Sequence, residues 1–329
     1  MSTFWGYFGI VLIGIVLVGL FGILIRYHWE IQIARKKIES LGSQVIETVF
    51  GQVEYIQVGT GYPVLVVHGA FGGFDQGLSI AKSLSFPNCQ IISVSRFGHL
   101  RSSLPQNADL NMQADAYASL LDVLKIKQAV VFAISAGSTS AIRFAARHPE
   151  RVSAMILFGP DAPGKTEISI PPRFIFDILF RSNFFYWILI TYFRKNMQNM
   201  MGLVPNGFIP TPEHSERINQ ILKGDLPIDR RMDGFIFETY TTASELLNSI
   251  TDSSPYPLGN IKTPVLIVNA LDDPITTKEN VQNLAVKFSN RYQYLVPDGG
   301  HLFFNHENEV KTEIIRFLTS TLPELNEKN

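Results

Sequence analysis

The start of the chain carries its longest apolar stretch, and the rest is patterned differently. From Phe4 to Ile25, 22 consecutive residues bear no charge. A helix of that length, at about 1.5 Å rise per residue, extends about 33 Å and crosses the hydrocarbon core of a bilayer. A secretory signal would show a charged start, a shorter apolar stretch and a small-residue cleavage site, none of which is present. The pattern predicts an uncleaved membrane anchor rather than a buried helix of a globular domain.

The flanking charges predict how this helix is oriented. Only the terminal amine precedes the span, whereas four cations follow it: Arg26, Arg35, Lys36 and Lys37. Short segments rich in lysine and arginine stay on the cytoplasmic side of a membrane. We therefore expect a single-pass membrane protein whose C-terminal bulk is cytoplasmic.

From Val45 onwards the chain reads as short strands. Thr48–Phe50 and Val53–Val58 flank Gly51 and predict a hairpin. Six further runs are apolar and mostly β-branched: Pro63–Val67, Gln90–Val94, Ala129–Ala133, Val152–Phe158, Pro264–Asn269 and Tyr292–Val296. Runs of this length indicate strands that are covered on both faces, as in a parallel sheet.

Helical patterns lie between these strands. Apolar residues recur every four positions from Met112 to Leu124, Ala136–Arg147 is rich in alanine, and Glu309–Leu318 has apolar residues at helical spacing. Strands that alternate with helices are typical of an α/β fold. We expect an open, mostly parallel sheet of eight strands with helices on both faces.

The alternation stops between about Pro163 and Pro257, where no strand pattern occurs. Phe174–Phe193 holds nine of the 38 aromatic residues of the chain, and its run Phe184–Phe193 of ten residues is too short to span a bilayer. This pattern predicts an inserted helical cap, whose aromatic residues either pack in a core or line a surface that reaches the substrate or the membrane. The expected organisation is anchor and linker (1–44), first core part (45–162), cap (163–257) and second core part (258–329).

Composition excludes several classes of protein. The 28 basic and 29 acidic residues give a net charge of −1, so no basic field is available to hold nucleic acid. The single cysteine, Cys89, excludes an internal disulfide framework and a cysteine-rich zinc site. Neither a metal-binding His-Glu-x-x-His pattern nor a phosphate-binding glycine motif occurs, so we expect no metal and no cofactor.

Three polar residues follow predicted strands, at the edge where open α/β sheets bind their ligands. Ser135 lies in a turn after Ala129–Ala133 and before a helix. The acidic pair Asp272-Asp273 follows Pro264–Asn269, and His301 comes shortly after Tyr292–Val296. Serine, acid and histidine thus occur in that order along the chain.

With these residues, the chain resembles the α/β-hydrolase fold family over about residues 45 to 320. The motifs that carry the resemblance are His68-Gly69-Ala70-Phe71-Gly72-Gly73, Ser95-Arg96-Phe97-Gly98-His99-Leu100-Arg101-Ser102, the Ser135 turn, His148-Pro149-Glu150-Arg151-Val152, Asp273-Pro274 and Gly300-His301. Any one of them would be weak alone, but six in the family's order are improbable by chance. The turn departs from the family pattern in one position, because Ala133 stands where the family usually has glycine.

The resemblance implies a serine hydrolase with a Ser135-Asp273-His301 triad. His301 would take the proton of the Ser135 hydroxyl, and Asp273 would hold the imidazole and stabilise the imidazolium. Backbone N–H groups would form the oxyanion hole, one from Ala136 and the other from Ala70, with Phe71 as the second choice.

Other residues compete for these roles. Ser135 could merely cap a helix, and Ser138 is its nearest rival as nucleophile. Asp272 and Asp161 are the alternatives to Asp273 as the acid, since some hydrolases take the acid from the strand before Asp161. Among the other histidines, His68 is expected to brace the oxyanion loop, His99 to be a solvated loop residue, and His306 to lie on the surface.

The function that follows is a membrane-anchored hydrolase of carboxylic esters, with small or lipid-like substrates, that acts through an acyl-serine. Carbon–carbon bond hydrolases, amidases and perhydrolases use the same triad and stay open as alternatives, whereas a serine in the turn argues against dehalogenases and epoxide hydrolases. A non-catalytic scaffold is the alternative from another class, because a fold alone does not determine a function. The sequence leaves the exact substrate and the oligomeric state open.

Overall fold

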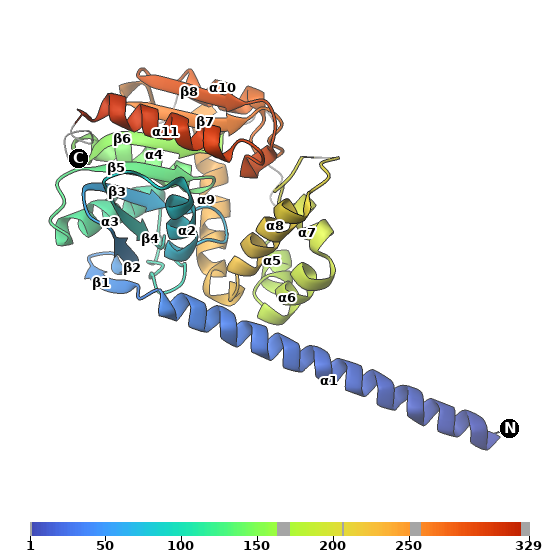
Figure 1. Cartoon of the computed structure of the whole chain (residues 1–329). Helices are drawn as coiled ribbons and strands as arrows, with labels where there is room; N and C mark the ends of the chain where they lie inside the picture. Colours follow the sequence, from blue (N-terminus) through green and yellow to red (C-terminus); the bar gives the residue numbers. More distant parts are fainter. Residues whose placement is uncertain (1, 163–171, 206, 251–257, 324–329) are drawn as a thin grey trace.

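A computed structural model describes residues 2–162, 172–205, 207–250 and 258–323. The first element, α1 (Ser2–Ser40), is one unbroken helix whose N-terminal half projects away from the rest of the molecule (Figure 1). Within the described ranges it is the one helix long and apolar enough to cross a membrane, and none of its most apolar window is buried. By length and composition, such a helix serves as a membrane anchor or as a signal sequence.

Eight strands form a single, mostly parallel sheet. Only β1 and β2 pair in antiparallel fashion, with each other and, for β2, with β4. The strand order is β1-β2-β4-β3-β5-β6-β7-β8. The strands are β1 (Gln44–Thr48), β2 (Gly51–Val58), β3 (Tyr62–Val67), β4 (Cys89–Val94), β5 (Ala129–Ile134), β6 (Val152–Phe158), β7 (Val265–Ala270) and β8 (Arg291–Val296).

Successive side chains of a strand point to opposite faces of the sheet, so the central strands contribute to two cores, one on each face. In β3, Leu65 and Val67 enter one core, while Val64 and Val66 enter the other. The first core is covered by α3 (Leu110–Val123), α4 (Gly137–Arg147) and α10 (Lys278–Ala285). The second is covered by α2 (Phe74–Leu84) and α11 (Glu307–Thr321). The structure therefore confirms the predicted α/β architecture.

Among the described residues, five helices between β6 and β7, here called the cap helices, share a separate aromatic core. They are α5 (Arg173–Leu179), α6 (Asn183–Tyr192), α7 (Arg194–Met200), α8 (Pro212–Gly224) and α9 (Met232–Ile250). A short 3-10 turn, η2 (Ile228–Arg230), joins α8 to α9, and three others lie outside the cap helices: η1 (Pro149–Arg151), η3 (Leu258–Asn260) and η4 (Gly300–Leu302). Tyr186 and Trp187 of α6 are fully buried in this core. The expected ends of the cap segment, at 163 and 257, lie outside the described residues.

The second half of α1 packs on the cap helices. Ile31 is buried in the aromatic core, Tyr27 contacts the ring of Trp187, and the Trp187 indole N–H donates to Glu30 at 3.0 Å. Residues 1–44 were expected to hold an anchor and a linker; the helix continues to Ser40, since no glycine or proline interrupts residues 26–40.

Two local expectations differ from the structure. The predicted strand Thr48–Phe50 is wrong, because β1 ends at Thr48 and Val49 and Phe50 form the hairpin turn. The Thr48 hydroxyl stabilises that turn, since it donates to the Gly51 carbonyl and accepts from the Phe50 N–H. Helices α2 and α10 were not predicted; α10 has only eight residues and presents few apolar side chains.

Candidate active site

Ser135 lies at the sharp turn between β5 and α4. Its φ angle is +48°, a left-handed conformation that a non-glycine residue adopts at a cost. The Ser135 N–H donates to the Phe158 carbonyl at 2.9 Å, which fixes the turn against β6. Gly137 is required two residues later, because a side chain there would collide with the His68 carbonyl oxygen. Ala133 fits within β5, where it is fully buried.

The two acidic residues after β7 have different partners. One oxygen of Asp273 accepts the N–H groups of Ile275 and Thr276 at 2.8 and 3.1 Å. Asp272 instead accepts the N–H groups of Gly299 and Gly300, at 3.3 and 2.9 Å, and so holds the turn that precedes His301.

The structure brings Ser135, His301 and Asp273 into one hydrogen-bonded chain. His301 Nε2 lies 3.0 Å from the Ser135 Oγ, and Nδ1 lies 2.8 Å from the second carboxylate oxygen of Asp273. With Asp273 ionised, Nδ1 carries the proton and Nε2 is free to accept the serine proton. The Ser135 residue is 9% exposed and Asp273 is 3% exposed, so these hydrogen bonds are shielded from bulk water.

The surroundings of His301 raise the pKa of its imidazole. Burial lowers the pKa of the imidazole, but the hydrogen bond to Asp273 and the negative charges of Asp273 and Asp161 outweigh that effect and raise it above its usual value. An imidazolium formed during a reaction is thereby stabilised where it would arise.

The competing residues have structural roles instead. The Ser138 hydroxyl donates to the Ser135 carbonyl at 2.7 Å and accepts the Asp161 N–H at 3.1 Å. Asp161 lies close enough to His301 for its negative charge to raise the pKa of the imidazole, but Asp273 is the carboxyl that is hydrogen-bonded to the ring. Asp161 has its own pKa raised by burial.

The loop after β3 lies against the nucleophile. A side chain at Gly69 would sit 3.2 Å from the Ser135 Cβ, so the loop approaches the serine closely there. His68 Nε2 accepts the Arg96 N–H at 3.0 Å, which leaves the proton on Nδ1, and Nδ1 donates to the Gly69 carbonyl at 2.8 Å. Gln76 brackets the same segment, because it accepts from the Gly69 N–H and donates to the Ala70 carbonyl.

The candidate oxyanion donors stay free of the protein's own hydrogen bonds. Among the described residues, neither the Ala70 N–H nor the Ala136 N–H has a protein acceptor. Phe71, the second choice in the loop, has a φ of +55° and stacks its ring on Phe235 of α9 at 3.9 Å.

Two other histidines, His99 and His306, contact neighbouring side chains outside the Ser135–His301–Asp273 chain of hydrogen bonds. The expectation that His99 is a solvated loop residue is wrong: it is fully buried, its ring contacts His68, and burial lowers its pKa well below the usual value. His306 caps the start of α11 and bonds to Asp298 and Glu309. Within the part of the chain that the structure describes, no group of three or more His, Cys, Asp or Glu side chains is arranged to hold a metal.

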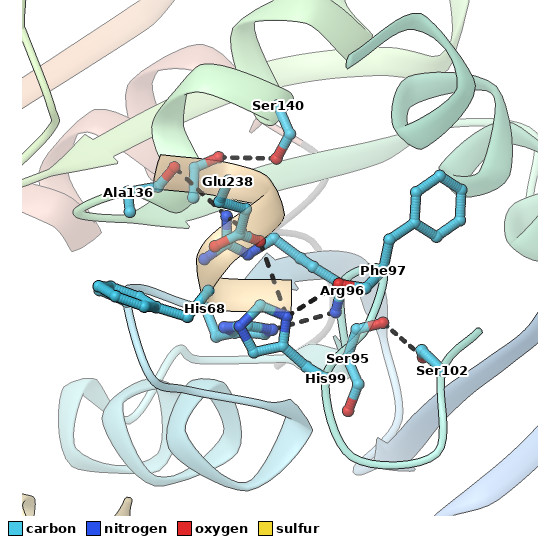
Figure 2. A network of polar contacts seen from close by, with 12 residues as sticks. His68, Ser95, Arg96, Phe97, His99, Ser102, Ala136, Ser140 and Glu238 are labelled. Atoms are coloured by element: carbon cyan, nitrogen blue, oxygen red, sulfur yellow. Dashed lines mark hydrogen bonds and ion pairs between the residues drawn. The ribbon is translucent and has the colours of Figure 1, made fainter. Parts of the chain in front are cut away.

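Sequence reasoning missed a buried ion pair beside this site, which Figure 2 shows. Arg96 Nη1 lies 2.7 Å from a carboxylate oxygen of Glu238, and both side chains are almost completely buried. Arg96 belongs to the motif after β4 but was given no role. Glu238 belongs to no motif; the one signal in the sequence is a lone acid in an aromatic run, Phe235-Ile236-Phe237-Glu238-Thr239-Tyr240.

Comparison with known proteins places this geometry in context. Residues 62–306 match the family model described as alpha/beta hydrolase fold. An uncharacterized hydrolase of Bacillus subtilis, YcgS, is 27% identical over 277 residues, which cover 80% of this chain and 92% of that protein.

Solved structures extend the likeness. An esterase of Exiguobacterium antarcticum superposes with a TM-score of 0.64 at 18% identity, covering 84% of this chain and 99% of that one. A membrane phospholipase A, described as a bacterial virulence factor, also has a TM-score of 0.64 at 18% identity, and covers 94% of this chain and 98% of its own. A match over about three quarters of the sequence, in the region that carries six of the eight strands and the three residues, shows that the chain belongs to the α/β-hydrolase fold family and is related to hydrolases.

Proposed function

We propose that the protein is a membrane-anchored serine hydrolase that cleaves carboxylic esters through an acyl-serine intermediate. The observation that carries this proposal is the chain of hydrogen bonds from Ser135 Oγ through His301 to Asp273. A serine hydroxyl is a weak nucleophile until a base takes its proton, and here the base is within hydrogen-bond distance and is oriented by a buried carboxylate. The esterase among the structural neighbours is consistent with an ester substrate.

The reaction then proceeds in two halves. Ser135 Oγ attacks the ester carbonyl carbon while its proton passes to His301 Nε2, and the Ala70 and Ala136 N–H groups stabilise the oxyanion. The intermediate collapses, and the leaving alcohol takes the proton from His301. A water molecule then attacks the acyl carbonyl carbon while His301 takes its proton. When this second intermediate collapses, the bond from Ser135 Oγ to carbon breaks, Oγ takes the proton from His301, and the carboxylic acid leaves the free enzyme. Losing one oxyanion donor typically costs about 2.7–4 kcal/mol of transition-state stabilisation.

Attachment to a membrane is supported by the way α1 joins the cap helices. Glu30 contacts Arg26, Lys223 and the indole of Trp187, so the helix is held against α6 and α8 just beyond the end of its apolar span. Phe185, Tyr192 and Phe193 of the same region are about half exposed. A bilayer around residues 4–25 would lie next to these aromatic side chains, which favours substrates that partition into lipid.

The membrane phospholipase A supports the same interpretation. Its match covers 94% of this chain, which is more than residues 41–329 make up, so the likeness reaches into α1. We extend the notion of a lipid-like ester substrate to this protein as part of the proposal, together with a cytoplasmic position of the catalytic part.

An activity-based fluorophosphonate probe tests the proposal on the detergent-solubilised full chain. We expect Ser135 to be labelled, and labelling to be lost in Ser135→Ala and strongly slowed in Asp273→Asn and His301→Ala. A folded wild type without labelling would contradict the proposal and favour a scaffold role. Labelling at Ser138 would contradict the assignment of the nucleophile, and hydrolysis of amides or carbon–carbon bonds, but not of esters, would contradict the substrate class.

A further inference from the structure

An oxyanion hole works only if its N–H groups point at the developing charge, so the peptide planes that carry them must be fixed. In a trans peptide the carbonyl and the N–H of the next residue point in opposite directions. The Ala70 N–H is therefore aimed by whatever holds the Gly69 carbonyl. That carbonyl accepts three protons: one from His68 Nδ1 at 2.8 Å, one from Arg96 Nη2 at 3.0 Å and the N–H of Gly72 at 3.2 Å.

Arg96 also contacts the turn that carries the second candidate donor, the Ala136 N–H. Besides Nη2 on the Gly69 carbonyl, its Nη1 lies 3.4 Å from the carbonyl oxygen of Ala136, the residue that follows the nucleophile. The guanidinium is planar and presents its N–H groups in a rigid fork, so one side chain spans the oxyanion loop and the turn after Ser135. Arg96 is only 1% exposed.

Glu238 keeps Arg96 in this place from a distant part of the chain. It lies on α9, and one of its carboxylate oxygens lies 2.7 Å from Arg96 Nη1 and 3.7 Å from His99 Nδ1 (Figure 2). Burial raises the pKa of the Glu238 carboxyl, and Arg96 opposes that shift because it favours the charged carboxylate. A buried charge of either residue alone would be costly, so the two side chains form one unit.

Helix α9 contacts the same loops at two further points. Phe235, one turn before Glu238, stacks on Phe71 of the oxyanion loop, and the Gly234 N–H donates to the Gly98 carbonyl at 3.0 Å. The position of α9 and the geometry of the loop are therefore connected through packing, a backbone hydrogen bond and an ion pair.

We propose that Arg96 and Glu238 are positioning residues of the oxyanion hole: Arg96 orients the Gly69–Ala70 peptide and the turn after Ser135, and Glu238 fixes Arg96 from cap helix α9. Neither side chain touches the substrate. The inference rests on the proposed function in that it assigns the Ala70 N–H to the oxyanion. It implies that a displacement of α9 lowers the rate of the chemical step even when substrate still binds.

The test compares two paired substitutions in the detergent-solubilised full chain. Arg96→Met with Glu238→Met removes both members of the ion pair, which avoids a lone buried charge. Tyr186→Phe with Asp225→Leu removes a buried polar contact of 2.6 Å within the cap helices and serves as the matched control, because it contacts neither the oxyanion loop nor Arg96. Arg96→Lys keeps the charge but cannot bridge both carbonyl oxygens.

For a soluble short-chain ester, we expect the Arg96/Glu238 double variant to lose about 10- to 100-fold in kcat with KM changed less than about threefold, because the lost interaction acts on the transition state. Arg96→Lys should lie between it and the wild type. Amide hydrogen exchange of residues 69–73, measured by mass spectrometry, should accelerate in the double variant and stay unchanged in the control.

Equal losses of kcat in the two double variants, an effect confined to KM, or unchanged exchange of residues 69–73 would each overturn the positioning role. Exchange does not require turnover. A wild type that hydrolyses no ester would therefore refute the proposed function, while the exchange comparison would still decide whether Arg96 and Glu238 hold the loop.

Discussion

Asp273 and His301 are 28 residues apart in the chain, yet a carboxylate oxygen of the first lies 2.8 Å from Nδ1 of the second. The other oxygen of Asp273 accepts two backbone N–H groups of its own turn, so both oxygens are engaged before any substrate is present. The imidazole is therefore oriented by a carboxylate that cannot rotate freely. Such preorganisation keeps the cost of orienting the base out of the reaction barrier.

The neighbouring acids Asp272 and Asp273 are predicted to differ sharply on substitution. Asp273→Asn should lower kcat by about 10⁴-fold, because an amide favours the wrong tautomer of His301. Asp272→Ala should lower kcat less than about 10-fold but reduce the free energy of unfolding by about 1–3 kcal/mol, since two N–H groups lose their acceptor. Steady-state kinetics and thermal unfolding of both variants check this. A larger loss of kcat for Asp272→Ala than for Asp273→Asn would mean that Asp273 is not the acid of the triad.

The pH dependence of kcat/KM should report the titration of His301. The base acts only when neutral, and its pKa in the folded protein is raised above 6.5 because Asp273 outweighs the effect of burial. Activity should therefore rise with pH through an apparent pKa above 6.5, and Asp273→Asn should shift this value downward in the residual activity. A rate that is already on its plateau at pH 6 would contradict the assignment.

The strands and the three candidate active-site residues could be predicted because their signals are local. A buried parallel strand needs a short apolar run, and a residue that follows such a run lies at the carboxyl edge of the sheet wherever the strand is placed. Ser135, Asp273 and His301 each satisfy this condition. The strand order of a parallel sheet was therefore all that was needed to predict that the three side chains lie close together.

The Arg96–Glu238 pair could not be predicted in the same way. Glu238 lies 142 positions after Arg96, on a helix whose packing depends on the whole cap, and a lone acid in an aromatic run is equally compatible with a solvated helix face. The burial of His99 has the same origin, because α9 covers the loop after β4. Contacts between an inserted segment and the core are determined by tertiary packing, which the periodicity of the sequence does not reveal.

Asp225 should make stability depend on pH. Burial raises the pKa of this carboxyl to about 7, while the Tyr186 hydroxyl, which donates to it at 2.6 Å, and Arg231 lower it. The folded state thus binds a proton that the unfolded state has already released between about pH 4 and pH 7, so stability falls as pH rises through this window. In Asp225→Asn, whose amide oxygen still accepts from Tyr186, this contribution is absent.

Thermal unfolding of wild type and Asp225→Asn at pH 5 and pH 8 measures the effect. The melting temperature of the wild type should fall relative to that of the variant between the two values. The change between the two pH values should be about 2.7 kcal/mol, because about two pH units of the window lie between pH 5 and pH 8. A difference between the two proteins that does not change with pH would mean that Asp225 is ionised throughout.

Removal of residues 1–25 should separate binding to lipid from catalysis. The large apolar side chains from Phe4 to Ile25 are mostly more than half exposed. The main contacts of α1 with the cap helices lie after this span, at Tyr27, Glu30 and Ile31. The shortened protein should therefore keep its fold and its kcat on a soluble short-chain ester. On long-chain esters in vesicles its rate should drop by about 10-fold or more, because the anchor no longer raises the local concentration of substrate. Full-length Ser135→Ala gives the background for both substrates, and an unchanged ratio of the two rates would mean that the anchor does not deliver the enzyme to a lipid substrate.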